Sequence, residues 1–328
     1  MKYDFIAIGD TTIDAFIRIK EASVHCTINR ERCEICMRFA DKIPYEDVWV
    51  VPAVGNSANA AVAAARLGLT SAIVTNVGAD KNGKNCIDTF KSEKVGTGFI
   101  RVHKRAKTNY HYVLWYEDDR TILIKHEKYD YQLPDIGSPK WIYLSSLGED
   151  ANHLYPKISA YLKTHPEIKL AFQPGTFQIK LGKERLESIY KRSDLFFCNK
   201  EEAGRIVGLK DAPIEKLLLG IQSLGPKIVV ITNGPRGAYA LEDAKMWSMR
   251  SYPDPKPPFE RTGAGDAFSS TFTIALALGL TVTEALRWAP VNSMSVVQYV
   301  GARAGLLTRK ELENFLKKAP ADYFPKSL

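Results

Sequence analysis

The chain of 328 residues contains 45% hydrophobic and 25% charged residues, which is ordinary for a soluble globular protein. Its formal net charge of +8 is modest for this length, and no long basic cluster is present, so we expect small-molecule partners and no nucleic acid. The apolar run before Asp10 is too short for a signal peptide or a membrane span, and no later stretch reaches about 18 apolar residues. We therefore expect a cytoplasmic protein with no membrane partner.

The first predicted element is a buried strand. Phe5 to Ile8 form a short apolar run that Gly9-Asp10 stops. Asp14 follows just beyond the carboxyl end of this strand. Ligands of open α/β sheets bind at that edge, so Asp14 is a candidate for holding substrate hydroxyls. The alternative is a solvated turn residue.

The next segment is irregular and rich in cysteine. Cys26, Cys33 and Cys36 lie close in the sequence, with His25 beside the first, and together they could bind zinc as a Cys3His site. Their spacing matches no common zinc finger, and a redox pair is a further alternative. Because the five cysteines are an odd number and no secretion signal precedes them, we favour plain reduced thiols.

A predicted Ala-rich helix follows Gly55 and ends at Gly68, which suits a helix C-cap. Asn59 lies in its first turns, where the side-chain amide could hydrogen-bond a substrate. In the alternative, Asn56 or Ser57 caps the helix and Asn59 is a surface residue.

A predicted strand from Ser71 to Val77 leads into a glycine-containing loop. The stretch from Gly78 to Asn85 approaches the P-loop pattern G-x-x-x-x-G-K-[ST]. However, Asn85 replaces the hydroxyl that would bind magnesium, so we disfavour a P-loop.

Residues 97–128 differ in character from the flanking chain. Two β-rich runs, at 110–116 and 121–125, surround a polar turn and predict a hairpin. With part of 15–53, this hairpin could form a small sheet over a site.

The remaining pattern predicts a mostly parallel, doubly wound α/β sheet. Short apolar runs alternate with helical patterns, as such a sheet requires. The runs lie at 141–145, 169–173, 195–198 and 227–232. No linker interrupts them, so we expect one domain over residues 1–328.

Polar groups follow two of these strands. Asn199 and Glu202 share a helix face at i, i+3, and a carboxylate there can hold Mg²⁺ directly or through water. The alternative is an N-cap with a capping-box acid. After the next strand, Thr232, Gly234 and Gly237 form a Thr-x-Gly-x-x-Gly turn.

The stretch from Thr262 to Asp266 precedes an apolar run that predicts a buried helix. Gly263 and Gly265, with Ala264 between them, let the backbone approach a ligand closely, and the helix N-terminus favours an anion. Asp266 in the first turn can take a proton from a hydroxyl. An anion turn beside a general base indicates phosphoryl transfer to an alcohol; a plain helix cap is the alternative.

Together these motifs resemble the ribokinase-like (PfkB) family of carbohydrate and nucleoside kinases over nearly the whole chain. The likeness rests on the order and spacing of the segment with Asn59, Asn-x-x-Glu at 199–202, Thr-x-Gly-x-x-Gly at 232–237 and Thr-Gly-Ala-Gly-Asp at 262–266. It implies the doubly wound ribokinase-like fold with a small β-sheet lid, and an ATP- and Mg²⁺-dependent kinase.

The resemblance also implies roles by position. Asp266 would deprotonate the acceptor hydroxyl, and the backbone N–H groups of Gly263, Ala264 and Gly265 would stabilise the transferred phosphoryl group. The other implied roles are Asn199 and Glu202 for magnesium and phosphates, Thr232, Gly234 and Gly237 for ATP, Asn292 near the adenine, and Asp14, Gly55 and Asn59 for substrate hydroxyls. Parts of 15–53 and 97–128 would supply the lid that excludes water.

Three features depart from the family pattern. Val54-Gly55 stands where Gly-Gly is usual. Glu260-Arg261 stands where Asp-Thr is common, which bears on whether a monovalent cation activates the enzyme. The cysteine-containing insertion 25–36 belongs to no family pattern.

The leading hypothesis is therefore a kinase that phosphorylates a hydroxymethyl group of a sugar, as ribokinase and fructokinase do. A nucleoside kinase is the alternative and would need an aromatic stacking partner such as Tyr110, Tyr112 or Trp115. A non-catalytic sugar or metal sensor is disfavoured, since a sensor needs no base at Asp266. Exposed lid edges also suggest a homodimer through the lid.

Overall fold

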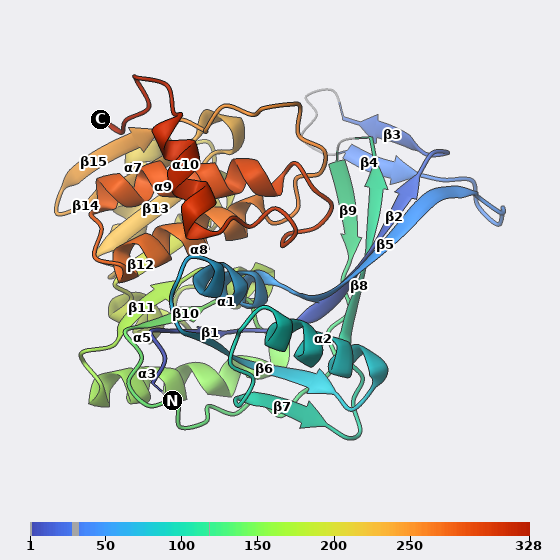
Figure 1. Cartoon of the computed structure of the whole chain (residues 1–328), viewed down its shortest axis with the longest axis horizontal. Helices are drawn as coiled ribbons and strands as arrows, with labels where there is room; N and C mark the ends of the chain where they lie inside the picture. The colour runs from blue at the N-terminus through green and yellow to red at the C-terminus, as the bar shows by residue number, and fades with distance from the viewer. Residues whose placement is uncertain (1, 28–32, 118) are drawn as a thin grey trace.

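The computed structural model describes residues 2–27, 33–117 and 119–328. Its centre is a ten-stranded sheet with helices on both faces (Figure 1). In spatial order the strands are β16 (Lys326–Ser327), β15 (Lys245–Met249), β14 (Ala238–Glu242), β13 (Ile228–Thr232), β12 (Leu195–Asn199), β11 (Lys169–Phe172), β10 (Trp141–Leu144), β1 (Phe5–Ile8), β6 (Ser71–Gly78) and β7 (Ile100–His103). From β13 to β7 all neighbours are parallel, and β14 to β16 extend the sheet antiparallel.

Both faces of the sheet are buried, as the continuous apolar runs predict. Phe5 and Ala7 of β1 point into one core, and Ile6 and Ile8 point into the other. The first core holds α1 (Asn56–Arg66), α2 (Lys81–Ser92), α8 (Ala264–Ala277), α9 (Val282–Val296) and α10 (Arg309–Lys317). The second holds α3 (Leu154–Thr164), α5 (Glu187–Arg192), α6 (Lys200–Val207) and α7 (Ile214–Gln222), with the short α4 (Thr176–Leu181) packed against it. The predicted doubly wound fold is confirmed.

The antiparallel edge was not predicted. β14 and β15 are joined by Asp243 and Ala244, which both have positive φ values, 47° and 63°. A two-residue turn of this kind usually contains Asn-Gly or Asp-Gly. Because alanine stands at the second position here, the sequence does not match the usual hairpin pattern.

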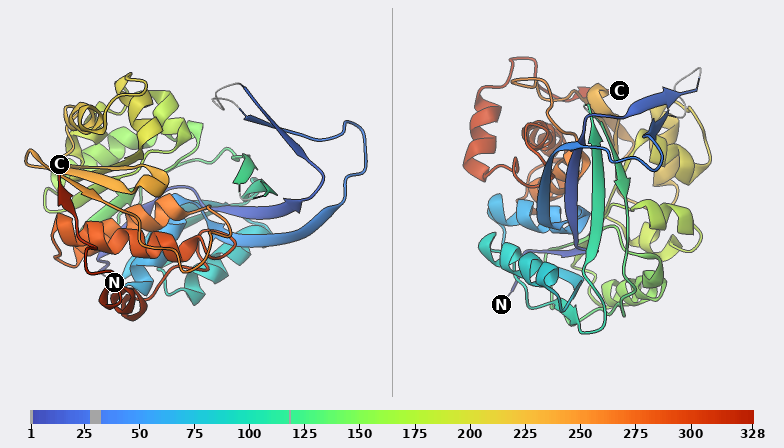
Figure 2. Two further views of the ribbon diagram at one scale, coloured as in Figure 1. Left: turned by 90° about the horizontal axis from the view of Figure 1, so that it is seen from above. Right: turned by 90° about the vertical axis from the view of Figure 1, so that its right-hand side faces the viewer.

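A second sheet of four strands projects from the large one (Figures 1 and 2). Its order is β5 (Tyr45–Val54), β2 (Thr12–Ile19), β8 (Asn109–Tyr116) and β9 (Asp119–Leu123). Strands from both predicted lid segments therefore pair with each other. β7, from within 97–128, joins the large sheet instead.

A separate hairpin, β3 (Ser23–Cys26) with β4 (Cys33–Cys36), extends beyond this small sheet (Figure 1). Cys26 faces Cys33 across the pair and forms a disulfide with it. The prediction of reduced thiols is wrong for these two residues, and so is the zinc site, because two of its three sulfurs are bonded to each other. Residues 28–32 of the 25–36 insertion lie outside the described residues.

The near P-loop is a structural turn. The side chain of Asp80 caps α2 by accepting from Gly83 N, and it also accepts from the backbone and hydroxyl of Thr108. A Cβ on Gly83 would lie 2.1 Å from the Gly78 carbonyl oxygen, so this loop is closed on itself. Across the described ranges, no helix is long and apolar enough to cross a membrane.

Candidate active site

The predicted site residues gather at the carboxyl edge of the central strands. Asn199 ends β12 and Thr232 ends β13, and the two are paired neighbours. The first turns of α1 and α8 meet at the same edge, because Asn59 of α1 contacts Asp266 of α8. Motifs that are far apart in the sequence therefore lie together at one site.

The turn before α8 has the geometry of an anion site. Gly263 has a φ of 82°, and a Cβ there would lie 2.2 Å from the Cβ of Ala302, so only glycine fits. The first helical hydrogen bond runs from Ala267 N to the Gly263 carbonyl at 2.8 Å. The N–H groups just before Ala267 precede this ladder, and that of Ala264 makes only a long bond of 3.4 Å to the Arg261 carbonyl.

The buried side chain of Glu260 fixes this turn through hydrogen bonds. Its carboxylate accepts from the backbone and hydroxyl of Thr262 and from Gly301 N. Arg120 of β9 also lies 3.8 Å from it. The turn is therefore fixed both by the body of the protein and by the small sheet.

Three side-chain amides surround the carboxylate of Asp266. Asn56 donates to Oδ1 at 2.7 Å and Gln173 to the same oxygen at 3.2 Å, while Asn59 donates to Oδ2 at 2.8 Å. Each carboxylate oxygen can accept two hydrogen bonds, so Oδ2 keeps a lone pair for a further proton. This arrangement suits a general base.

Burial raises the pKa of Asp266, and the nearby charge of Asp14 raises it further. The amides of Asn59, Gln173 and Asn56 oppose that shift by stabilising the charged form. Tyr143 donates to Gln173 Oε1, which turns the amide nitrogen of Gln173 toward Asp266. The net rise makes Asp266 a stronger base than an ordinary aspartate.

Asp14 lies on β2, buried, and not in a turn. Its neighbour across the strand pair is His111 of β8, whose Nδ1 is 3.4 Å from Asp14 Oδ1. Asn59 is also buried. The solvated alternatives for Asp14 and Asn59 are therefore wrong.

Gly55, and neither Asn56 nor Ser57, is the N-cap of α1. Its φ is 114°, and a Cβ would approach the Asp10 carbonyl oxygen to 2.7 Å. Asn56 is thereby free to reach Asp266, and Ser57 bonds to Ser145. The missing second glycine of the family pattern leaves this turn intact.

A cavity of about 460 Å³ opens beside the anion turn. Its walls come from the end of β13, the connector before α8, and one face of α8 and α9. The residues are Thr232, Gly234, Pro235, Gly237, Ser251, Tyr252, Pro253, Asp254, Pro258, Arg261, Ala264, Gly265, Phe268, Pro290, Ser293, Met294 and Val297. Thr232, Gly234 and Gly237 are thus brought together with the turn.

Asn292 does not reach this cavity. It is fully buried; its Nδ2 donates to Thr271 Oγ1 at 2.8 Å and its Oδ1 accepts from Leu307 N at 2.9 Å. Both ends of the amide are occupied by the protein, so the expected contact with adenine is corrected. Ser293 and Met294, one and two residues later, line the wall.

Asn199 and Glu202 form the capping box of α6. Glu202 accepts from Asn199 N through Oε2, and Asn199 Oδ1 accepts from Glu202 N, each at 2.8 Å. Burial raises the pKa of Glu202, and the charge of Asp266 adds to that rise. A buried carboxylate can hold a divalent cation, and the cation would stabilise its charged form.

Comparison with known proteins places the chain in a family. The family model described as pfkB family carbohydrate kinase matches residues 21–309. The chain belongs to this family. A ribokinase of Bacillus subtilis (strain 168) is 28% identical to this pfkB-family chain over 270 residues, covering 80% of this chain and 87% of the relative.

Solved structures share the fold of this pfkB-family chain. Arabidopsis thaliana ribokinase, complexed with ribose and ATP, matches with a TM-score of 0.79 and 20% identity over 97% of this chain and 99% of that one. A Methanocaldococcus jannaschii nucleoside kinase matches with a TM-score of 0.79 and 18% identity over the same shares. The ribokinase-like fold is confirmed, with its small separate sheet.

Several residues of the pfkB-family site escaped sequence reasoning. Gln173 ends the predicted strand at 169–173 and His111 lies in a predicted strand, yet neither belongs to a motif we singled out. Asn56 was interpreted as a cap, and Arg261 as a departure. Gln173 could have been identified from its position at the carboxyl end of a buried strand, and Arg261 from its position beside the anion turn.

Proposed function

We propose that this chain is an ATP-dependent kinase that transfers the γ-phosphoryl group to a hydroxymethyl group of a sugar. The observation that carries the proposal is the carboxylate of Asp266, held by three amides and set one residue after an anion turn at the wall of a large cavity. Membership of a carbohydrate kinase family supports a sugar as the acceptor.

In the proposed reaction, Asp266 Oδ2 accepts the proton of the acceptor hydroxyl. The hydroxyl oxygen forms a bond to the γ-phosphorus as the bond from that phosphorus to the β–γ bridging oxygen breaks, and ADP leaves with the bridging oxygen. The N–H groups of Gly263, Ala264 and Gly265 stabilise the charge on the transferred group. Arg261, on the cavity wall, adds a positive charge.

The nucleotide would occupy the cavity, with Thr232, Gly234 and Gly237 along its wall. Gly237 has a φ of 89°, and a Cβ there would lie 2.1 Å from the Met249 carbonyl oxygen, so the bare backbone of this turn is required. We assign the phosphates to the anion turn and the Asn199 end of β12.

Mg²⁺ would be held near Glu202 and Asn199, where it would neutralise phosphate charge during transfer. A monovalent cation is not part of the proposal. Glu260, which precedes the anion turn, already faces Arg120 and donors from Thr262 and Gly301.

The nucleoside alternative has weaker support. Trp115 is buried against Phe259 and Arg18. Tyr110 and Tyr112 alternate with His111 on β8, so they face away from Asp14. Trp115 lies on the same face as Asp14 and His111, but it packs against Phe259 and Arg18. The intact base argues against a sensor.

We further propose that the small sheet is the lid and that it pairs with a second copy of this chain. Cross-strand neighbours share a face, so Val50, Ala15, Tyr112 and Leu123 form one surface, opposite to Asp14. Val50, Tyr112 and Leu123 are exposed there. An apolar surface on a two-edged sheet fits a homodimer.

The test is an ADP-release screen with MgATP across pentoses, hexoses and nucleosides. We expect a sugar to give the highest kcat/KM. A nucleoside as the best acceptor would replace the sugar assignment, and absence of transfer to every acceptor would refute the kinase.

A further inference from the structure

The small sheet contacts the chain just before the anion turn. Arg18 of β2, Trp115 of β8 and Arg120 of β9 are cross-strand neighbours, so they form one row on one face of this sheet. The guanidinium of Arg18 lies 4.7 Å from the centre of the Trp115 ring, and that ring packs edge-on against Phe259 at 5.0 Å. Arg120 Nε lies 3.8 Å from Glu260 Oε1. The row therefore faces residues 259 and 260.

Glu260 links this row to the turn. Its carboxylate is buried, with 1% of the residue exposed. Both oxygens bind backbone of the turn and its surroundings, because Oε1 accepts from Thr262 N at 2.7 Å and Oε2 accepts from Gly301 N at 3.3 Å. Among the ion pairs of the described residues, only that with Arg120 gives this carboxylate a positive partner. A buried carboxylate without a counter-charge is costly, so Arg120 stabilises the charge that orients Thr262.

The loop after α9 also holds the two residues before the turn. Phe259 N and Glu260 N both donate to the Val297 carbonyl, at 2.8 and 3.2 Å. A Cβ on Gly301 of this loop would lie 3.5 Å from the ring of Phe16 on β2, so the small sheet packs closely against the loop as well. The position of residues 259 and 260, and of the anion turn that follows them, therefore depends on where the small sheet lies.

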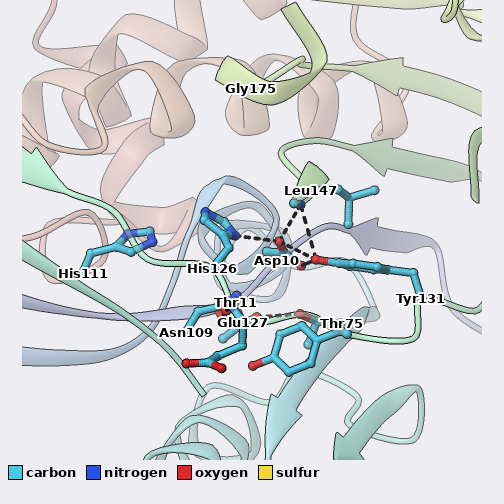
Figure 3. A network of polar contacts seen from close by, with 12 residues as sticks. Asp10, Thr11, Thr75, Asn109, His111, His126, Glu127, Tyr131, Leu147 and Gly175 are labelled. Atoms are coloured by element: carbon cyan, nitrogen blue, oxygen red, sulfur yellow. Dashed lines mark hydrogen bonds and ion pairs between the residues drawn. The ribbon is translucent and has the colours of Figure 1, made fainter. Parts of the chain in front are cut away.

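The same face of the small sheet reaches the acceptor side of the proposed site. Asp14 shares this face with Arg18 along β2, and His111 of β8 is its paired neighbour. Figure 3 shows His111 beside His126, whose Nδ1 lies 3.0 Å from Asp10 Oδ2. One face of one sheet thus contacts both the acceptor side and the segment that leads into the anion turn.

We propose that Arg120 is a positioning residue for phosphoryl transfer: through Glu260, it lets the small sheet fix the anion turn in the geometry that the transferred group requires. Arg120 acts at a distance from the reacting atoms, because its partner is Glu260 and Glu260 in turn binds Thr262. The N–H groups of the turn are aligned while the small sheet rests on residues 259 and 260. The inference rests on the proposed function, to which it adds a residue of the small sheet.

The first experiment is Arg120→Leu, which removes the guanidinium and keeps an apolar side chain. With MgATP and the best acceptor, kcat should fall about tenfold, less than the loss of about 10²–10³-fold for a missing anion-hole donor, because the donors remain and lose only their alignment. The KM values of ATP and of the acceptor should stay within about twofold. Arg101→Leu is the matched control: Arg101 lies on β7 of the large sheet and pairs with Asp130, so kcat should not change.

The second experiment tests whether Arg120 acts through Glu260. Glu260→Gln removes the charge with which Arg120 pairs, so it should lower kcat by itself. The double variant Arg120→Leu/Glu260→Gln should be no slower than Glu260→Gln alone, because residues that act as one unit are not additive. Losses that multiply in the double variant would overturn the inference, since Arg120 would then act by another route.

Two further outcomes of the first experiment would also overturn it. One is an unchanged kcat in Arg120→Leu. The other is a loss confined to the KM of the acceptor, which would show that Arg120 only holds the small sheet against the body. A native enzyme that binds ATP and transfers phosphate to no acceptor would refute the proposed function instead.

Arg120→Lys serves as the second variant if Arg120→Leu lowers Tm. Lysine keeps the positive charge without the planar fork, so it should recover part of the lost kcat. A lysine variant that folds like the native protein and is as slow as the leucine variant contradicts a role for the charge, and with it the inference.

Discussion

The chemistry of the site depends on how one carboxylate is held. Asp266 accepts from Asn56, Gln173 and Asn59, and these amides fix its orientation. Burial raises its pKa in spite of them. The amides therefore place Asp266, and burial makes it basic.

Asp266→Asn should lower kcat by about 10³-fold, the usual contribution of a general base. ATP binding should persist, because the anion turn and the cavity wall are unchanged. Folding should be little affected: the raised pKa means that the charged form is disfavoured in the folded state, so a neutral side chain offsets part of the lost hydrogen bonding. Steady-state kinetics and ATP titration check this, with Asp88→Asn on α2 as the control. Near-native turnover would remove Asp266 from its role.

The pH dependence of kcat/KM for the acceptor should carry an acidic limb set by Asp266. Since its pKa is raised from 3.8, activity should begin to fall at a pH above that ordinary value. Below the limb the base is protonated and kcat/KM drops about tenfold per pH unit. Gln173→Leu removes a donor that stabilises the charged form, so the limb should move to higher pH. A shift to lower pH would contradict the assignment.

At the residue scale, the sequence analysis singled out Asp14, Asn59 and Asp266, and the structure brings them near one another, while their roles stay predictions. It did not predict the amide of Gln173 or the imidazole of His111. Neither residue type is unusual at the end or middle of a strand, and only the tertiary pairing brings them to Asp266 and Asp14.

At the scale of elements, α6 joins two interpretations that the sequence left as alternatives. The capping box of Asn199 and Glu202 is present, and burial raises the pKa of the Glu202 carboxylate. A cap and a metal contact are compatible because Glu202 uses Oε2 for the backbone of Asn199.

Substitution can separate the two roles. Glu202→Gln keeps a side-chain acceptor for the cap and removes the charge, so the Mg²⁺ concentration for half-maximal rate should rise about tenfold with Tm nearly constant. Glu202→Ala should in addition destabilise the protein by about 1 kcal/mol through the lost cap. Kinetic Mg²⁺ titration and thermal unfolding are the measurements. An unchanged Mg²⁺ requirement in Glu202→Gln would leave Glu202 as a cap alone.

At the scale of the molecule, the parallel sheet was predictable because each buried strand is a continuous apolar run between helical patterns. The small sheet was predictable only in outline. The four strands of this sheet are residues 12–19, 45–54, 109–116 and 119–123. The sequence of one strand does not indicate which distant strand it will pair with. The disulfide of Cys26 and Cys33 depends on the same kind of pairing.

The last prediction concerns the face of the small sheet that lies opposite to Asp14. Val48 and Val50 on the edge strand β5 are 43% and 54% exposed, and Tyr112 and Leu123 extend the apolar surface. Such a surface on an unpaired edge is costly in a monomer, so we expect a dimer in solution.

Light scattering after gel filtration should give twice the chain mass of 36.7 kDa. Val48→Lys with Val50→Lys should give the monomer, because two charges would be buried in the interface. Leu219→Lys on α7, an equally exposed apolar site on the large body, should leave the dimer intact. A native protein that elutes as a monomer at every concentration, or a lysine pair that leaves the dimer unchanged, would show that this face is not the interface.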